Sequence, residues 1–236
     1  MKGWHTKNGY SVSCIMSGRS NVFMLSGNGK NILIDTGPGY KWQNLRDTLS
    51  KLHLKNIDLL ILTHTHFDHA GNAARIKNEY GLKVVVSKYE AKFLQSGENT
   101  MIYGTVLPTR FLVRKVAPLL LNKVKYEACQ PDIILDQHFD LKDFGFQAYI
   151  MHTPGHSPGS QCVIVDNEIA IAGDTMFGVF PRSVFPPFAD NEDELIRSWG
   201  KLLATGCNLF LPSHGSPDSR DLLLKEYKKR RSEKIR

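Results

Sequence analysis

His64-Thr65-His66-Phe67-Asp68-His69 is the stretch that decides the fold, and it places three imidazoles and one carboxylate within six residues. An apolar run at 57–63 precedes it. His64 and His66 lie two residues apart at the end of a predicted strand, so both side chains can face the same way. Histidine and carboxylate groups this close together indicate a metal site. The spacing differs from the helical metalloprotease pattern, in which two histidines lie four residues apart with a glutamate between them.

Apolar patterns on either side of this stretch predict a series of strands and helices. Strands are expected at residues 21–25, 31–35, 57–63, 83–86, 146–151, 161–165, 168–172 and 209–211, and helices at 42–52, 70–80, 89–94, 191–204 and after residue 215. Asn28-Gly29 favours a hairpin turn, and a second hairpin is expected around Asp166-Asn167. The segments 32–36 and 171–175 look alike, which suggests an internal duplication of a strand–strand–helix unit.

Three further candidate ligands follow predicted strands or turns. His156 comes after Thr-Pro-Gly, Asp174 after Ala-Gly, and His214 after Leu-Pro-Ser. Side chains at the ends of several strands can converge on one edge of a sheet. The available ligands are then His64, His66, Asp68, His69, His156, Asp174 and His214. One tetrahedral zinc ion takes four ligands, so this larger set suits two ions that share one carboxylate.

The ordered motifs of residues 32–215 resemble the metallo-β-lactamase-fold hydrolase superfamily, in its glyoxalase II-like or lactonase-like branch. They are His-x-His-x-Asp-His, Gly155-His156, Gly173-Asp174-Thr175 and His214-Gly215. The resemblance implies an α/β fold, a four-layer αβ/βα sandwich with a helical insertion. It also implies two divalent ions, Zn²⁺ first and Fe or Mn as alternatives. By this resemblance His64, His66 and His156 hold one ion, Asp68, His69 and His214 hold the other, and Asp174 bridges them.

Such a centre implies a metal-dependent hydrolase. Two divalent ions carry four positive charges, and two carboxylates with a bridging hydroxide supply three negative charges, so the centre can still polarise a carbonyl or phosphoryl oxygen. A metal lowers the pKa of bound water from about 15.7 to about 7. Our hypothesis is that the bridging hydroxide attacks an ester, thioester or lactone carbonyl of a small, partly apolar substrate. Asp68 is the candidate catalytic residue that orients this nucleophile.

Other activities of the same fold remain open at this point. True metallo-β-lactamases do not have an aspartate at the bridging position, whereas this chain has Asp174 there, which argues against β-lactamase activity. Glyoxalase II resembles residues 173–177, but its family carries an additional helical domain after the last ligand. Lactonases have a tyrosine at the position of Phe177. A phosphodiesterase or ribonuclease, a mononuclear iron persulfide dioxygenase and a metal-bound sensor without turnover are the alternatives.

Composition fits one globular domain over residues 1–236, with 42% hydrophobic and 22% charged residues. The long segment 97–130 is expected to be a helical insertion, either a cap on the site or an additional layer. Residues 225–236 contain seven basic and two acidic residues, and so supply five of the seven net positive charges. We expect this basic tail to be a solvated helix end, with a small-molecule substrate and no nucleic acid as partner. No oligomeric state is predicted.

The first twenty residues lack the apolar core of a signal peptide, and no window is apolar enough to span a membrane. The four cysteines lie far apart in the sequence, so we expect reduced thiols and a cytoplasmic protein. Cys162 and Cys207 are expected in the core.

Several other residues near the motifs have two possible roles. Asp35 is expected either to fix a ligand histidine or its loop, or to form a simple turn. The Pro- and Phe-rich loop 176–188 either lines an apolar pocket beside the metals or packs onto the core. The remaining histidines are interpreted as structural or surface residues: His5, His53, His138 and His152.

Overall fold

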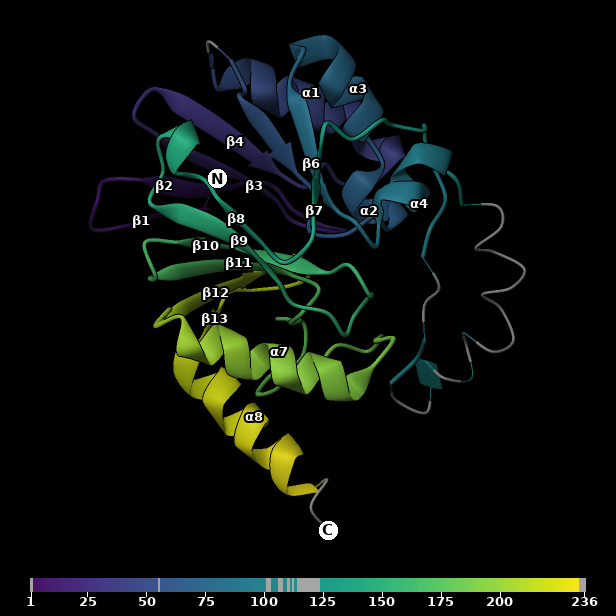
Figure 1. Cartoon of the computed structure of the whole chain (residues 1–236), viewed down its shortest axis with the longest axis vertical. Helices are drawn as coiled ribbons and strands as arrows, with labels where there is room; N and C mark the ends of the chain where they lie inside the picture. The colour runs from purple at the N-terminus through teal and green to yellow at the C-terminus, as the bar shows by residue number, and fades with distance from the viewer. Residues whose placement is uncertain are drawn as a thin grey trace.

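Two mixed sheets pack face to face in the computed structural model, and helices cover the outer face of each sheet (Figure 1). The structure describes residues 2–54, 56–100, 103–105, 108–109, 111, 113 and 124–233. The predicted class, a four-layer αβ/βα sandwich, is confirmed. Within the described residues, no helix combines the length and the apolar character that a membrane crossing needs.

The first sheet has, among the described residues, seven strands in the order β1-β2-β3-β4-β5-β6-β7. Their bounds are β1 (Lys2–His5), β2 (Ser11–Met16), β3 (Val22–Gly27), β4 (Lys30–Ile34), β5 (Leu59–Ile61), β6 (Lys83–Ser87) and β7 (Ile133–Leu135). Strands β1 to β4 pair antiparallel, whereas β4 to β7 pair parallel. The carboxyl ends of β4, β5 and β6 therefore meet at one edge.

The second sheet has, in the same described part of the chain, the order β13-β12-β11-β10-β9-β8. Its strands are β8 (His138–Asp140), β9 (Ala148–His152), β10 (Gln161–Val165), β11 (Ile169–Gly173), β12 (Leu209–Pro212) and β13 (Asp218–Ser219). Only the β11–β12 pair is parallel among these pairings. Strands β9, β11 and β12 thus run in the same direction, and their carboxyl ends share one edge.

Helices α1 (Trp42–Lys51) and α3 (Ala73–Tyr80) lie outside the first sheet, and α7 (Glu192–Ala204) and α8 (Arg220–Glu233) lie outside the second (Figure 1). The short helices α2 (Phe67–Ala70) and α4 (Ala91–Ser96) lie at the edge where the parallel strands end. Two 3₁₀ turns complete the described elements, η1 (Gly39–Lys41) and η3 (Lys142–Phe144).

Strand alternation produces three apolar layers. Ile32 and Ile34 face the core between the sheets, whereas Leu33 between them faces the helices on the other side. The 57–63 run behaves as predicted: it is buried on both faces, although the strand itself covers only Leu59–Ile61. A third layer contains Trp199 between the second sheet and α7 and α8.

The predicted hairpins are present. Asp166 and Asn167 both have φ of 54°, as the two central residues of a type I′ turn require. The predicted helix at 191–204 begins after Asn191, whose side chain accepts hydrogen bonds from the backbone of Asp193 and Glu194.

The single helix predicted over 70–80 is wrong, because the chain breaks at Gly71 and Asn72 into α2 and α3. The Asn72 side chain donates to the carbonyl oxygens of Thr36, Gly37 and Pro38. A Cβ atom on Gly71 would lie 2.5 Å from the backbone nitrogen of Gly39. This close approach fixes the path of the chain beside the candidate ligands.

The helical core predicted for the 97–130 insertion lies mostly outside the described residues. Its described ends contact the candidate site. Thr105 donates to the carbonyl oxygen of Pro186, and Tyr126 donates to that of Thr65. The described ends of the insertion therefore lie against the 176–188 loop and against the 64–69 stretch.

Candidate metal centre

The structure brings all seven candidate ligands to the edge where the parallel strands end. His64 and His66 follow β5, and Asp68 and His69 lie in α2. The second sheet contributes the other three from the ends of β9, β11 and β12, namely His156, Asp174 and His214. His214 is partly exposed, whereas the other six are buried.

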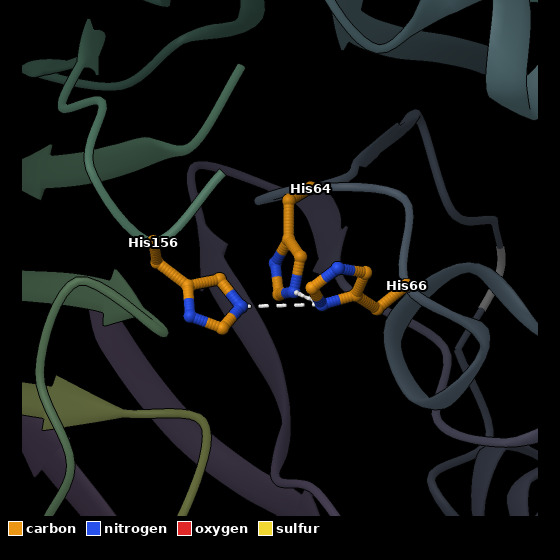
Figure 2. Close-up of side chains that lie close together, drawn as sticks. All are labelled: His64, His66 and His156. Atoms are coloured by element: carbon orange, nitrogen blue, oxygen red, sulfur yellow. Dashed lines mark hydrogen bonds between the residues drawn. The ribbon is translucent and has the colours of Figure 1, made fainter. Parts of the chain in front are cut away.

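Three imidazoles form one group (Figure 2). Nε2 of His64 lies 2.9 Å from Nδ1 of His66, and Nε2 of His156 lies 3.1 Å from the same Nδ1. Figure 2 shows the three rings pointing toward a common point, with His156 approaching from a different part of the chain. Three imidazole nitrogens converging in this way suit a borderline divalent ion such as zinc.

Asp174 lies between this group and a second one. One oxygen, Oδ2, is 3.4 Å from Nε2 of His156 and 3.2 Å from Nε2 of His214. The other, Oδ1, is 3.5 Å from Nε2 of His69. Asp68 faces His69 and His214 at 3.9 and 3.8 Å, so these three make up the second group. The Asp174 carboxylate therefore faces residues of both groups, which is the geometry of a shared ligand.

Four of the histidine rings are oriented by a contact to the ring nitrogen that faces away from the centre, called the far nitrogen here. Nδ1–H of His156 donates to the carbonyl oxygen of Phe188 at 2.9 Å, which leaves the Nε2 lone pair facing the centre. The far nitrogens of the other rings contact side-chain oxygens: His64 Nδ1 with Thr63 Oγ1 at 3.2 Å, His66 Nε2 with Thr100 Oγ1 at 2.8 Å, and His69 Nδ1 with Asp35 Oδ2 at 2.8 Å. Such contacts fix the tautomer and direction of a ligand.

Asp35 fixes a ligand histidine, as one of the two sequence interpretations expected. Besides His69, its carboxylate accepts hydrogen bonds from the backbone N–H of Thr63 at 2.8 Å and from the hydroxyl of Ser213 at 3.2 Å. Ser213 immediately precedes His214. The fully buried Asp35 therefore connects His69 with the residue that precedes His214.

The electrostatics of the cluster fit a bound cation. Burial lowers the pKa of His64 and His66 well below the usual value, and neighbouring imidazoles lower it further. These rings are neutral and offer their lone pairs. Burial also acts to lower the pKa of His69, but three carboxylates, led by Asp174, outweigh it and raise this pKa to about 10. Negative charge thus converges at His69.

Two buried atoms at the centre have no hydrogen-bond partner within the described structure: Nε2 of His69 and Oδ1 of Asp174. A buried polar atom without a partner is costly, and a metal ion would satisfy both atoms at once. Five imidazoles and two carboxylates are also the ligand types that zinc accepts. The residues present fit divalent metal ions.

Sequence reasoning missed Glu90, Arg19 and Thr100. Glu90 is fully buried and connects two ligand loops. Arg19 Nε lies 3.1 Å from Oδ2 of Asp68, and more than half of the arginine side chain is exposed. No local pattern distinguishes these residues, since each acts on a ligand that is distant in sequence.

The loop 176–188 packs onto the core, which is one of the two roles that the sequence left open. Phe185 is buried against Trp199 and packs the loop onto the core. Phe177 stacks on the ring of His214 at 4.6 Å. Val179 and Phe180 are about half exposed, at 52% and 48%. Apolar surface is therefore available close to the second group.

The described part of the basic tail is the end of α8, where Lys225, Lys228, Lys229 and Arg231 are exposed and Arg230 is partly buried. α8 continues to Glu233, and the guanidinium of Arg230 lies 3.8 Å from the centre of the Phe185 ring. This part of the helix thus packs against the 176–188 loop. Residues 234–236 of the predicted tail lie outside the described structure.

The remaining histidines and the cysteines stay outside the described metal groups. His152 contacts the carbonyl oxygen of Pro158 and stacks on Tyr89. Cys162 and Cys207 are buried in the layer under α7, as predicted, and all four thiols are free.

A family model described as the metallo-beta-lactamase superfamily matches residues 17–214. The chain belongs to this superfamily, and the resemblance predicted from the ligand motifs is confirmed. A metallo-beta-lactamase structure from Cronobacter sakazakii superimposes with a TM-score of 0.68 over 98% of this chain and 92% of that one. Its sequence identity is 18%, so it supports the fold alone.

Three relatives extend the comparison. A probable metallo-hydrolase of Methanocaldococcus jannaschii is 31% identical, covering 72% of this chain and 70% of its own length. The hydroxyacylglutathione hydrolase GloC of Haemophilus influenzae is 30% identical over 84% of this chain and 86% of its own length. The human acyl-coenzyme A thioesterase MBLAC2 is 32% identical and covers 67% of this chain, which spans 59% of that protein. The chain is a metal-dependent hydrolase of the superfamily.

Proposed function

We propose that the chain hydrolyses the carbonyl of an ester, thioester or lactone at a centre of two divalent ions, with thioesters as preferred substrates. The observation that carries this proposal is the place of Asp174, whose carboxylate faces His156 of one group of candidate ligands and His69 and His214 of the other. The preference for thioesters is supported by relatives named as an acyl-coenzyme A thioesterase and a hydroxyacylglutathione hydrolase.

The two groups divide the ligands. His64, His66 and His156 would hold one ion, and Asp68, His69 and His214 the other, with Asp174 between them. Bound there, divalent ions make a water molecule nucleophilic at neutral pH and polarise the carbonyl oxygen of the substrate. Zinc is the preferred ion, because imidazole nitrogen dominates the ligand set.

The protein's own groups orient the reaction. The Asp68 carboxylate accepts a hydrogen bond from the attacking water and directs it toward the carbonyl carbon. The ion pair with Arg19 holds that carboxylate in place. The Asp35 carboxylate accepts a hydrogen bond from Nδ1–H of His69 and so keeps that ring turned toward the centre.

A partly apolar substrate is supported by the residues beside the second group. Phe177 covers one face of the His214 ring, and Val179 and Phe180 remain exposed on the same loop. The acyl chain of a substrate would lie against this surface. Phe177 also lacks a hydroxyl group, so it offers no hydrogen bond to a lactone ring.

A substrate panel tests the proposal. Metal-loaded protein is assayed with acyl-coenzyme A and acylglutathione thioesters, matched oxygen esters, lactones and an aryl phosphodiester. We expect kcat/KM to be highest for thioesters and to rise from acetyl to octanoyl chains. Faster cleavage of the phosphodiester, or no hydrolysis of any acyl substrate, would overturn the proposal.

A further inference from the structure

Glu90 is a buried carboxylate that lies outside the candidate ligand set. It follows β6 immediately before α4, and none of its surface is exposed. Four donors surround it: the backbone N–H and hydroxyl of Thr65, the hydroxyl of Ser157 and the backbone N–H of Gly159. All four come from the two loops that carry one group of candidate ligands.

The two loops belong to different sheets. Thr65 lies between His64 and His66, after β5 of the first sheet. Ser157 follows His156, after β9 of the second sheet. Glu90 therefore connects the loops across the junction of the two sheets. The distance between His156 and the other two rings depends on how these loops are held.

The carboxylate divides its oxygens evenly between the loops. Oε2 accepts from Thr65, with the backbone nitrogen at 3.1 Å. Oε1 accepts from Ser157 at 2.6 Å and from the backbone of Gly159 at 3.2 Å. An amide at this position would keep one oxygen and face the other backbone N–H with its own NH₂ group. Glutamine could thus accept from the backbone N–H of only one of the two loops.

Gly159 gives the carboxylate room to reach its donors. A Cβ atom on this residue would lie 2.2 Å from Cγ of Glu90. Thr65 is also fixed from its other side, since Tyr126 donates to its carbonyl oxygen at 2.9 Å. The connection between the loops is therefore closely packed as well as hydrogen-bonded.

We propose that Glu90 is a positioning residue for the His64, His66 and His156 group, and that it sets the spacing of these ligands across the two sheets. Asp35 has the corresponding role for the other group, because its carboxylate connects Thr63 and His69 with Ser213, the residue before His214. Each metal subsite then has its own buried carboxylate. The inference rests on the proposed metal centre.

The test is the Glu90→Gln variant, titrated with Zn²⁺ by calorimetry after its metal has been removed. Loss of a ligand's hydrogen-bonded support typically weakens metal affinity about 10- to 100-fold. We expect this loss for one of two ions only. The melting temperature of the metal-free protein is measured alongside. A merely structural defect would lower this temperature and would weaken the binding of both ions together.

Two backgrounds assign the affected ion. In the His214→Ala background the ion at the first group remains, and Glu90→Gln should weaken it about 10- to 100-fold. In the His156→Ala background the ion at the second group remains, and its affinity should not change when Glu90→Gln is added. The opposite pattern, or equal effects in both backgrounds, would overturn the role of Glu90.

Asp166→Asn is the matched control. It also converts a buried acid to an amide, but in the β10–β11 turn at the opposite end of the strands from the ligands. We expect it to leave both ions unchanged. If Glu90→Gln fails to fold, Ser157→Ala removes one donor and should weaken the same single ion. One ion in the wild type would contradict the two-metal function, yet the His214→Ala comparison would still decide the role of Glu90.

Discussion

Nδ1 of His69 lies 2.8 Å from Oδ2 of Asp35, and both side chains are completely buried. The same carboxylate accepts the backbone N–H of Thr63 through its other oxygen. A histidine from α2 is thereby tied to the ends of two parallel strands. The candidate metal centre is thus supported by a carboxylate that contacts a candidate ligand and lies outside the ligand set.

Asp35→Asn should lower kcat/KM about 10- to 100-fold, because an amide cannot accept from both His69 and Thr63. Backbone strain will not contribute, since Asp35 has φ of 61° and asparagine tolerates this region well. Steady-state kinetics and metal analysis of the purified variant check the prediction. Wild-type kinetics with full metal content would contradict it.

Asp68→Asn should lower kcat about 10²- to 10⁴-fold, the range typical of a group that manages a proton or orients the nucleophile. Metal content should fall much less, because the other six ligands remain. The measurement is kcat at saturating thioester together with metal per chain. Unchanged turnover would exclude a catalytic role for Asp68.

Local sequence predicted the ligands because they stand in short motifs at strand ends. His64 to His69 are six consecutive residues, His156 follows a recognisable turn, and Asp174 and His214 follow the ends of predicted strands. The hairpin around Asp166-Asn167 was equally local. All of these features depend on residues that are neighbours in the chain.

The features that sequence reasoning missed depend on distant contacts. β1 and β2 begin the first sheet, but their mixed polar residues gave no clear alternation. The break between α2 and α3 depends on Asn72 binding carbonyl groups more than thirty residues away. Glu90 lies within the short helix predicted at 89–94, and its burial arises only when the two sheets meet.

Gly71→Ala should destabilise the protein by about 1–3 kcal/mol, because the added methyl group would lie 2.3 Å from the carbonyl oxygen of Phe67. The backbone at Gly71 is ordinary, with φ of −57°, so the effect is steric. Thermal unfolding measures it. Gly3→Ala is the control, since its nearest contact would be an ordinary 3.5 Å and its melting temperature should match the wild type. Equal melting temperatures for both variants would contradict the steric account.

Asp218→Asn should change how stability depends on pH. Burial raises the pKa of Asp218 to about 6, above the value of about 3.9 in an unfolded chain. The folded state therefore favours the protonated acid, and stability is lost as pH rises from about 4 through 6. The variant should melt higher than the wild type at pH 7.5, with a smaller difference at pH 4.5. A difference that is the same at both pH values would contradict this account.

Metal analysis of the purified protein, combined with a thioester hydrolysis assay, tests the central claim most directly. The two groups of ligands around Asp174 predict about two zinc ions per chain. Chelation should abolish turnover, and added zinc should restore it. A single iron ion with oxygen consumption, or thioester hydrolysis that persists after complete removal of metal, would contradict the two-metal hydrolase.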